Sequence, residues 1–113
     1  MEILTSDVGA TIARVTLSGR LDIAGAEVIA LPLATVAGAK QGLIIDMSAV
    51  SFLASIGIRA LVASAKAVQQ RGGKMVLVVN GGSSVLMSLE ATGVDQLIPV
   101  FRNSADAERA AVA

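Results

Sequence analysis

Apolar and polar positions at the start of the chain follow the two-residue period of β-strands. Residues 1–6 are predicted to form a first strand, and the next three residues supply a turn. From residue 11 to residue 18 apolar side chains alternate with polar or small ones, and several of them are β-branched. We therefore expect a hairpin whose second strand ends at Gly19.

An alanine-rich stretch with a helical pattern follows Asp22. This aspartate is placed to cap the first turn, and Glu27 lies near the electropositive end of the helix. Pro32 lies within the stretch, where a proline either bends a helix or begins a second helical segment. The pattern leaves both possibilities open.

The rest of the chain is arranged around residues 43–73. Residues 43–45 are apolar, as in a strand buried inside a parallel sheet, and Asp46 follows at its carboxyl end. Residues 47–54 are predicted to be a linker, and Ser55 is predicted to begin a helix that runs to about residue 71. Apolar side chains fall on one face of that helix by i, i+3, i+4, i+7 spacing, namely Ile58, Leu61, Val62, Ala65 and Val68.

The C-terminal third continues the alternation of strand and helix. Residues 75–79 form the next predicted strand, and residues 97–101 form an edge strand because Pro99 cannot donate a ladder hydrogen bond. The residues predicted to cap or end the two remaining helices are Ser83 or Ser84, Gly93, and Asn103 or Ser104. Met75, Met87 and Phe101 are assigned to the core.

The predicted element order is β-β-α-β-α-β-α-β-α in one α/β domain that spans residues 1–113. The first strand is antiparallel to the second, and the remaining strands are mainly parallel. Because β-α-β crossovers are right-handed, we expect a mixed sheet with its helices packed mainly on one face.

The composition excludes several classes of site. The chain has 113 residues, nine basic and nine acidic, so it lacks the positive charge expected of a nucleic-acid-binding protein. It has no histidine and no cysteine, which excludes the usual zinc sites, Cys or His catalysis, and redox thiols. We expect no catalytic site, no metal and no cofactor.

Charge-free runs are also too short to indicate a membrane protein. The longest, residues 28–39 and residues 75–89, fall below the ~18 residues of a spanning segment, and each is broken by Pro or Gly. The first residues have neither the basic start nor the apolar centre of a signal peptide. We expect a soluble, cytoplasmic protein with no direct membrane insertion.

Four segments in order and spacing resemble the STAS domain family, and within it the bacterial anti-sigma factor antagonists. They read LSGRLD at residues 17–22, LIIDMSAVSFLASIG at residues 43–57, RGGKMVLV at residues 71–78 and LEATGVDQLIPVF at residues 89–101. The resemblance covers nearly the whole chain. It implies a regulatory protein that binds a serine-kinase-type anti-sigma factor and thereby releases a sigma factor.

The resemblance also implies a phosphorylation site. In that family the kinase partner phosphorylates a serine at the start of the helix after the third strand, which corresponds to Ser55, and a PP2C-type phosphatase removes the phosphate. The common motif has an aspartate just before this serine, and many members carry a second hydroxyl after it. Here these positions are Ala54 and Ile56.

Residue chemistry supports two roles for Ser55. A serine at a helix start is expected to cap the helix, which stabilises it by ~1 kcal/mol. A phosphate there would lie beside unpaired N–H groups, so the free domain should tolerate it, whereas a desolvated partner contact should not. The predicted partner-binding residues around it are Asp22, Asp46, Ala54, Ser55, Ile56, Gly57 and Arg59.

Other readings remain open. Asp22 and Asp46 either cap helices and turns or help to shape the partner surface. The main alternative function is a STAS subunit of a transport or signalling-scaffold assembly that binds its partner without phosphate. A nucleotide-binding domain is a third possibility, and the protein is expected to be a monomer or a weak homodimer.

Overall fold

The computed structural model describes residues 1–112 and contains one mixed sheet. Its five strands lie in chain order, with the first pair antiparallel and every later pair parallel. The strands are β1 (Glu2–Asp7), β2 (Ile12–Leu21), β3 (Gly42–Leu53), β4 (Lys74–Val78) and β5 (Val100–Phe101). The helices are α1 (Ile23–Ala39), α2 (Ser55–Gln70), α3 (Ser84–Ala91) and α4 (Ser104–Val112), with a 3₁₀ turn η1 at Val94–Gln96. The predicted hairpin and element order are confirmed.

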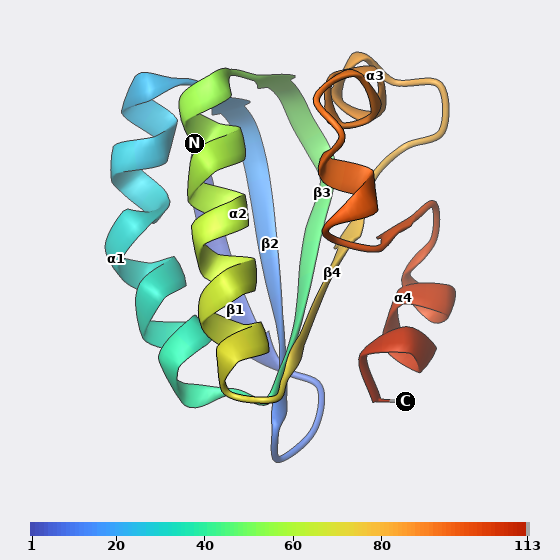
Figure 1. Ribbon diagram of the computed structural model, residues 1–113. Coiled ribbons are helices and arrows are strands. Elements are labelled where there is room, and N and C mark those ends of the chain that lie inside the picture. Colours follow the sequence, from blue (N-terminus) through green and yellow to red (C-terminus); the bar gives the residue numbers. More distant parts are fainter. Residues whose placement is uncertain (113) are drawn as a thin grey trace.

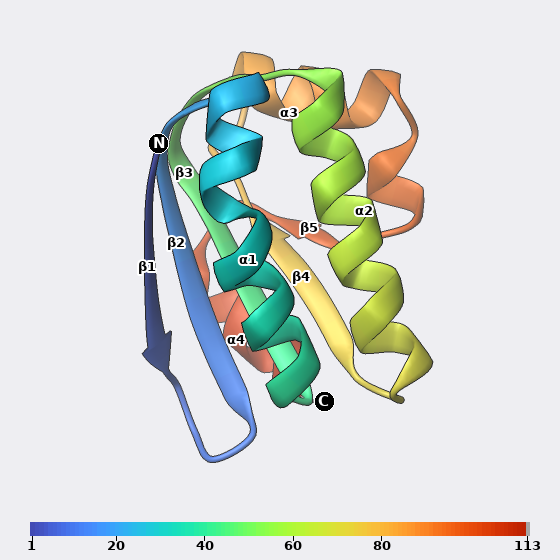
Figure 2. The same ribbon diagram turned by 90° about the vertical axis from the view of Figure 1, so that its left-hand side faces the viewer.

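Helices cover the two faces of the sheet unequally (Figures 1 and 2). The main core lies beneath α1, α2 and α3, and is built from alternate residues of the strands, such as Val15, Leu17, Ile45 and Leu77. A smaller cluster on the opposite face joins Ile44, Val76 and Val78 to two alanines of α4. The prediction that the helices pack mainly on one face is therefore confirmed, with α4 as the exception.

Strand β3 is much longer than predicted. The segment expected to be a linker continues the strand to Leu53, because residues beyond Asp46 still pair with β2 as far as the register of Leu21 with Leu53. Two register shifts in this pairing, between Thr16 and Ser18 and between Gly19 and Arg20, let the polar residues of β3 remain in the ladder.

Helix α1 resolves the question of Pro32. It is one continuous helix that contains the proline. Proline removes the hydrogen bond to the carbonyl four residues earlier, that of Val28, whose side chain is exposed. Water can satisfy that carbonyl, so the helix does not have to end there.

The C-terminal elements differ from prediction in two places. Strand β5 contains only Val100 and Phe101, because η1 and the turn after it occupy residues 94–98. Pro99 has no N–H to donate, although its carbonyl accepts from the Leu77 N–H at 2.9 Å. Met87 is 64% exposed on α3, so its assignment to the core was wrong, whereas Met75 is buried.

Three predicted caps are present: Asp22 caps α1, Ser83 caps α3, and the Asn103 side chain accepts from the N–H of Asp106 in α4.

Candidate functional site

The first turn of α2 is held in place by the end of β2. The Ala54 N–H donates to the carbonyl of Leu21 at 2.9 Å. A side chain on Gly57 would approach the Leu21 Cγ to 2.6 Å, so only glycine lets the helix lie this close to the strand. Since Leu21 is fully buried, the start of α2 rests on a rigid support.

Ser55 does not cap α2, and the expectation that it would was wrong. The N-cap is Ala54, which has an extended backbone and accepts the first helical hydrogen bond, from the Ile58 N–H, at 3.1 Å. Ser55 is therefore the first residue inside the helix. It is exposed, and its hydroxyl makes no hydrogen bond with any residue in the range 1–112.

This leaves α2 as the one α-helix of the described chain that lacks a side-chain cap. The other three use Asp22, Ser83 and Asn103. In α2 the N–H groups of residues 55–57 have no protein acceptor among residues 1–112. The helix therefore presents its positive end and three free donors beside an accessible hydroxyl.

Asp22 lies at the neighbouring helix start. Its carboxylate accepts from the Gly25 N–H at 2.9 Å, and the Arg20 Nε lies 3.6 Å from its other oxygen. The Gly25 hydrogen bond, with a smaller contribution from the Arg20 charge, lowers the pKa of Asp22. Both α1 and α2 begin at the same end of the sheet (Figure 2), so Asp22 borders the surface around Ser55.

The sequence analysis missed two residues at this end of the molecule. The Arg20 guanidinium lies 4.3 Å from the centre of the Phe52 ring, and the two residues are paired in the β2–β3 register. Phe52 is 39% exposed, as is Ile56, which follows Ser55 in the chain. Phe52 is one of only two aromatic residues in the chain, which could have drawn attention to it. Arg59 is exposed one turn further along α2.

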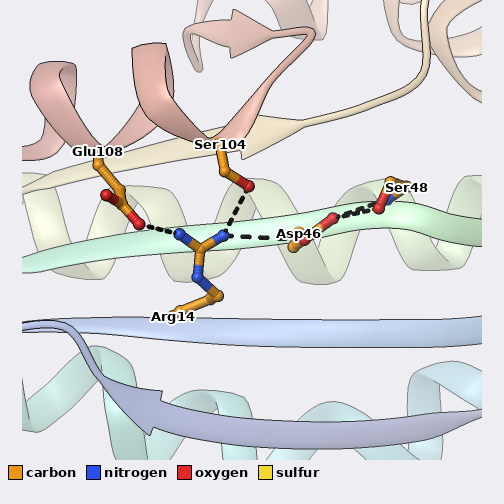
Figure 3. A network of polar contacts seen from close by, with 5 residues as sticks. All are labelled: Arg14, Asp46, Ser48, Ser104 and Glu108. Carbon is orange, nitrogen blue, oxygen red and sulfur yellow. Dashed lines mark hydrogen bonds and ion pairs between the residues drawn. The ribbon is translucent and has the colours of Figure 1, made fainter.

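Asp46 does not join this surface, and its expected position near Ser55 was wrong. It lies inside β3, and its side chain is on the face covered by α4 (Figure 3). The N–H and hydroxyl of Ser48 donate to its carboxylate at 3.0 and 2.6 Å. The Arg14 Nη1 lies 3.8 Å from it and also donates to Ser104 Oγ at 3.0 Å, while the other Arg14 nitrogen, Nη2, pairs with Glu108. This network ties α4 to the sheet.

Six of the seven predicted partner-binding residues therefore lie at one end of the molecule, and Asp46 lies elsewhere. Among residues 1–112 no three Asp or Glu side chains gather closely enough to hold a metal ion. None of the helices in this range combines the length and apolar content needed to cross a membrane.

A family model described as the STAS domain matches residues 6–107. The chain belongs to the STAS domain family. Its structure is similar to that of an anti-sigma factor antagonist from Mycobacterium paratuberculosis, with 27% identity, a TM-score of 0.87, and coverage of 99% of this chain and 94% of that one.

Two further solved structures show how widely the fold is used. Phosphorylated SpoIIAA, a cell fate determinant of Bacillus, is 18% identical, with a TM-score of 0.73 and coverage of 96% of this chain and 99% of that one. The murine anion transporter Slc26a9 is 26% identical, with a TM-score of 0.74, and this STAS chain covers 94% of its own length but 18% of the transporter. A search of curated proteins found no match.

Proposed function

We propose that this STAS protein is an anti-sigma factor antagonist that binds a serine-kinase-type anti-sigma factor and is switched off by phosphorylation of Ser55. The observation that carries the proposal is the exposed, unbonded hydroxyl of Ser55 on the one α-helix of the described chain without a side-chain cap. The protein acts by binding and catalyses nothing itself. The kinase transfers the terminal phosphoryl group of ATP to Ser55 Oγ, releasing ADP.

The free domain can carry this phosphate without unfolding. A phosphoserine has nearly two negative charges, and here it would lie beside three free N–H groups at the positive end of α2. Since Ser55 makes no hydrogen bond within the described chain, phosphorylation breaks none. The fold is compatible with a covalent phosphate, because the phosphorylated SpoIIAA structure shares it.

A complex with the anti-sigma factor cannot accommodate the phosphate on Ser55 as easily. Ser55 is followed in α2 by the partly exposed apolar side chain of Ile56, and Phe52, also partly exposed, lies near the end of β3 just before the helix. A partner that binds over the first turn of α2 would cover Ile56 together with Ser55. Enclosing a dianion among apolar groups costs several kcal/mol unless new cationic partners meet it. Phosphorylation is therefore expected to release the partner while leaving the antagonist folded.

The resemblance to the mycobacterial antagonist supports the partner class. That protein matches over nearly the full length of both chains. Asp22, Ala54, Ile56 and Arg59 are at least partly exposed near Ser55 and form the proposed contact surface. Gly57 is buried against Leu21, so its role is to let the first turn of α2 lie close to β2. A PP2C-type phosphatase would reset the switch.

The test is phosphoryl transfer from labelled ATP by the serine-kinase-type anti-sigma factor of the same genome. We expect one phosphate per chain, lost in Ser55→Ala and retained in Ser84→Ala. Ser84 is the matched control because it is also exposed and is the first residue of a helix, but of one capped by Ser83. Phosphate on Ser84, or none on either serine, would refute the proposal.

Similarity to the anion transporter favours a second candidate, a STAS subunit that binds a transport assembly permanently. The two functions differ in their response to charge at Ser55. A Ser55→Asp variant that still binds its partner with wild-type affinity would support the transport subunit and count against the switch.

A further inference from the structure

Helix α1 has apolar side chains on all sides. Of its seventeen residues only Glu27 is charged. A helix with this composition is normally buried on all sides. Here only one side of the helix is buried, the side that carries Ile29, Leu33 and Ala37, whereas Leu31 is 77% exposed. The outer side of α1 is therefore an apolar surface without a cover in the single chain.

A groove runs beside this surface, between α1 and α2. Two adjoining hollows of about 340 and 330 Å³ share the side chains of Ala30 and Ala60. Figure 2 shows the two helices side by side over the same face of the sheet. Alanines form half of its lining, so the groove is mainly apolar and has room for a larger side chain from outside, and its charged lining residues are Glu27, Arg59 and Arg71.

Leu31 stands at the rim of the groove. It is four residues after Glu27 and three before Ala34, both of which line the hollows, so it shares their side of the helix. It is also the central residue of α1, with eight helical residues on each side. An exposed large side chain beside a small-residue groove makes this surface complementary to itself.

Charges on the two helices are complementary in the same way. The one charge on α1 is acidic, Glu27, and both charges on α2 are basic, Arg59 and Lys66. None of the three forms an ion pair within residues 1–112. A two-fold rotation near Leu31 reverses the helix direction, which brings Glu27 of one copy towards Lys66 of the other.

We propose that the face formed by α1 and α2 pairs two copies of this chain. Leu31 of each copy enters the alanine-lined groove of the other, and Glu27 and Lys66 pair reciprocally at the two ends. An isologous contact of this kind uses the side chain, the groove and both signs of charge on one surface. The pairing does not depend on a kinase or on Ser55, so its test is separate from that of the proposed function.

Sedimentation equilibrium of the purified chain tests the pairing, at concentrations up to about 1 mM. We expect the mass to rise from 11.4 kDa towards twice that value. Leu31→Glu should weaken association at least about 10-fold, because it places a charge in an apolar groove. Met87→Glu is the matched control, since Met87 is 64% exposed on α3, and it should leave association unchanged. Circular dichroism confirms that both variants are folded.

A charge exchange distinguishes this pairing from any other self-association. Glu27→Lys alone and Lys66→Glu alone should each weaken the dimer by about 2- to 10-fold, since each dimer contains the pair twice. The double exchange should restore most of the affinity. Three results would overturn the proposal: a chain that remains monomeric, a dimer that Leu31→Glu leaves intact, or a double variant that associates no more tightly than either single variant. A monomeric chain whose α1–α2 face binds a different protein would overturn it as well.

Discussion

Gly57 gives the most direct test of how α2 is positioned. Replacing a helical glycine by alanine normally stabilises a helix by about 1 kcal/mol. At Gly57 the added methyl group would lie 2.6 Å from Leu21 Cγ and 3.0 Å from the Leu21 carbonyl oxygen. Leu21 cannot move aside, because it is fully buried and its carbonyl accepts from the Ala54 N–H. Forcing a methyl group into such a site costs about 1–3 kcal/mol, and a contact this short belongs at the upper end.

The net expectation for Gly57→Ala is a loss of about 2 kcal/mol. Gly38 provides the matched control, because it also lies in a helix, α1, and no atom lies within 4 Å of its added methyl group. Gly38→Ala should therefore raise the free energy of unfolding by up to about 1 kcal/mol, and by less if the end of the helix frays.

Urea denaturation of both variants measures the difference. We expect a gap of about 2–3 kcal/mol, or roughly 10 °C in melting temperature. Gly57→Ala should also slow phosphoryl transfer to Ser55 while the protein is still folded, because the first turn of α2 must shift. If the two variants were equally stable, the close approach of α2 to Leu21 would not be the constraint we describe.

Three further outcomes follow from the local geometry. Ala54→Asp should stabilise the protein by about 1 kcal/mol in thermal denaturation, because Ala54 is an N-cap without a capping side chain; no gain would mean that the free N–H groups of α2 are already satisfied. Arg14→Met should cost about 1–3 kcal/mol and speed hydrogen exchange in α4, since it leaves Glu108 and its neighbours without their cation; unchanged exchange would show that the network does not hold α4. The pKa of Asp22 is lowered in the folded state, so its contribution to stability is present above the ordinary carboxyl value of about 3.9 and is lost as the pH falls through the lower folded value. The Asp22→Asn variant should therefore be less stable than the wild type at neutral pH, and the difference in their free energies of unfolding should shrink only below about pH 4. A difference that stays constant down to about pH 2 would contradict this.

Local patterns in the sequence were enough to predict the order of elements and the class of fold. Alternation identified the hairpin, and i, i+3, i+4, i+7 spacing identified the face of α2 that packs on the sheet, where Leu61, Ala65 and Val68 are buried. Asp22 could be recognised as a cap because capping involves only residues within one turn. The position of Ser55 at the start of α2 was predictable for the same reason.

Tertiary contacts decided what these patterns could not. The polar residues beyond Asp46 were predicted to form a linker, yet their pairing with β2 keeps them in β3. The same pairing places Asp46 on the side of the sheet where it contacts Arg14, next to α4. Whether Ser55 caps α2 or lies inside its first turn depends on where the Leu21 carbonyl holds the chain, 33 residues earlier than Ala54. Strand pairing and helix docking join residues that are distant in the chain, so their geometry is not encoded in any local window. In this protein that geometry left the Ser55 hydroxyl free.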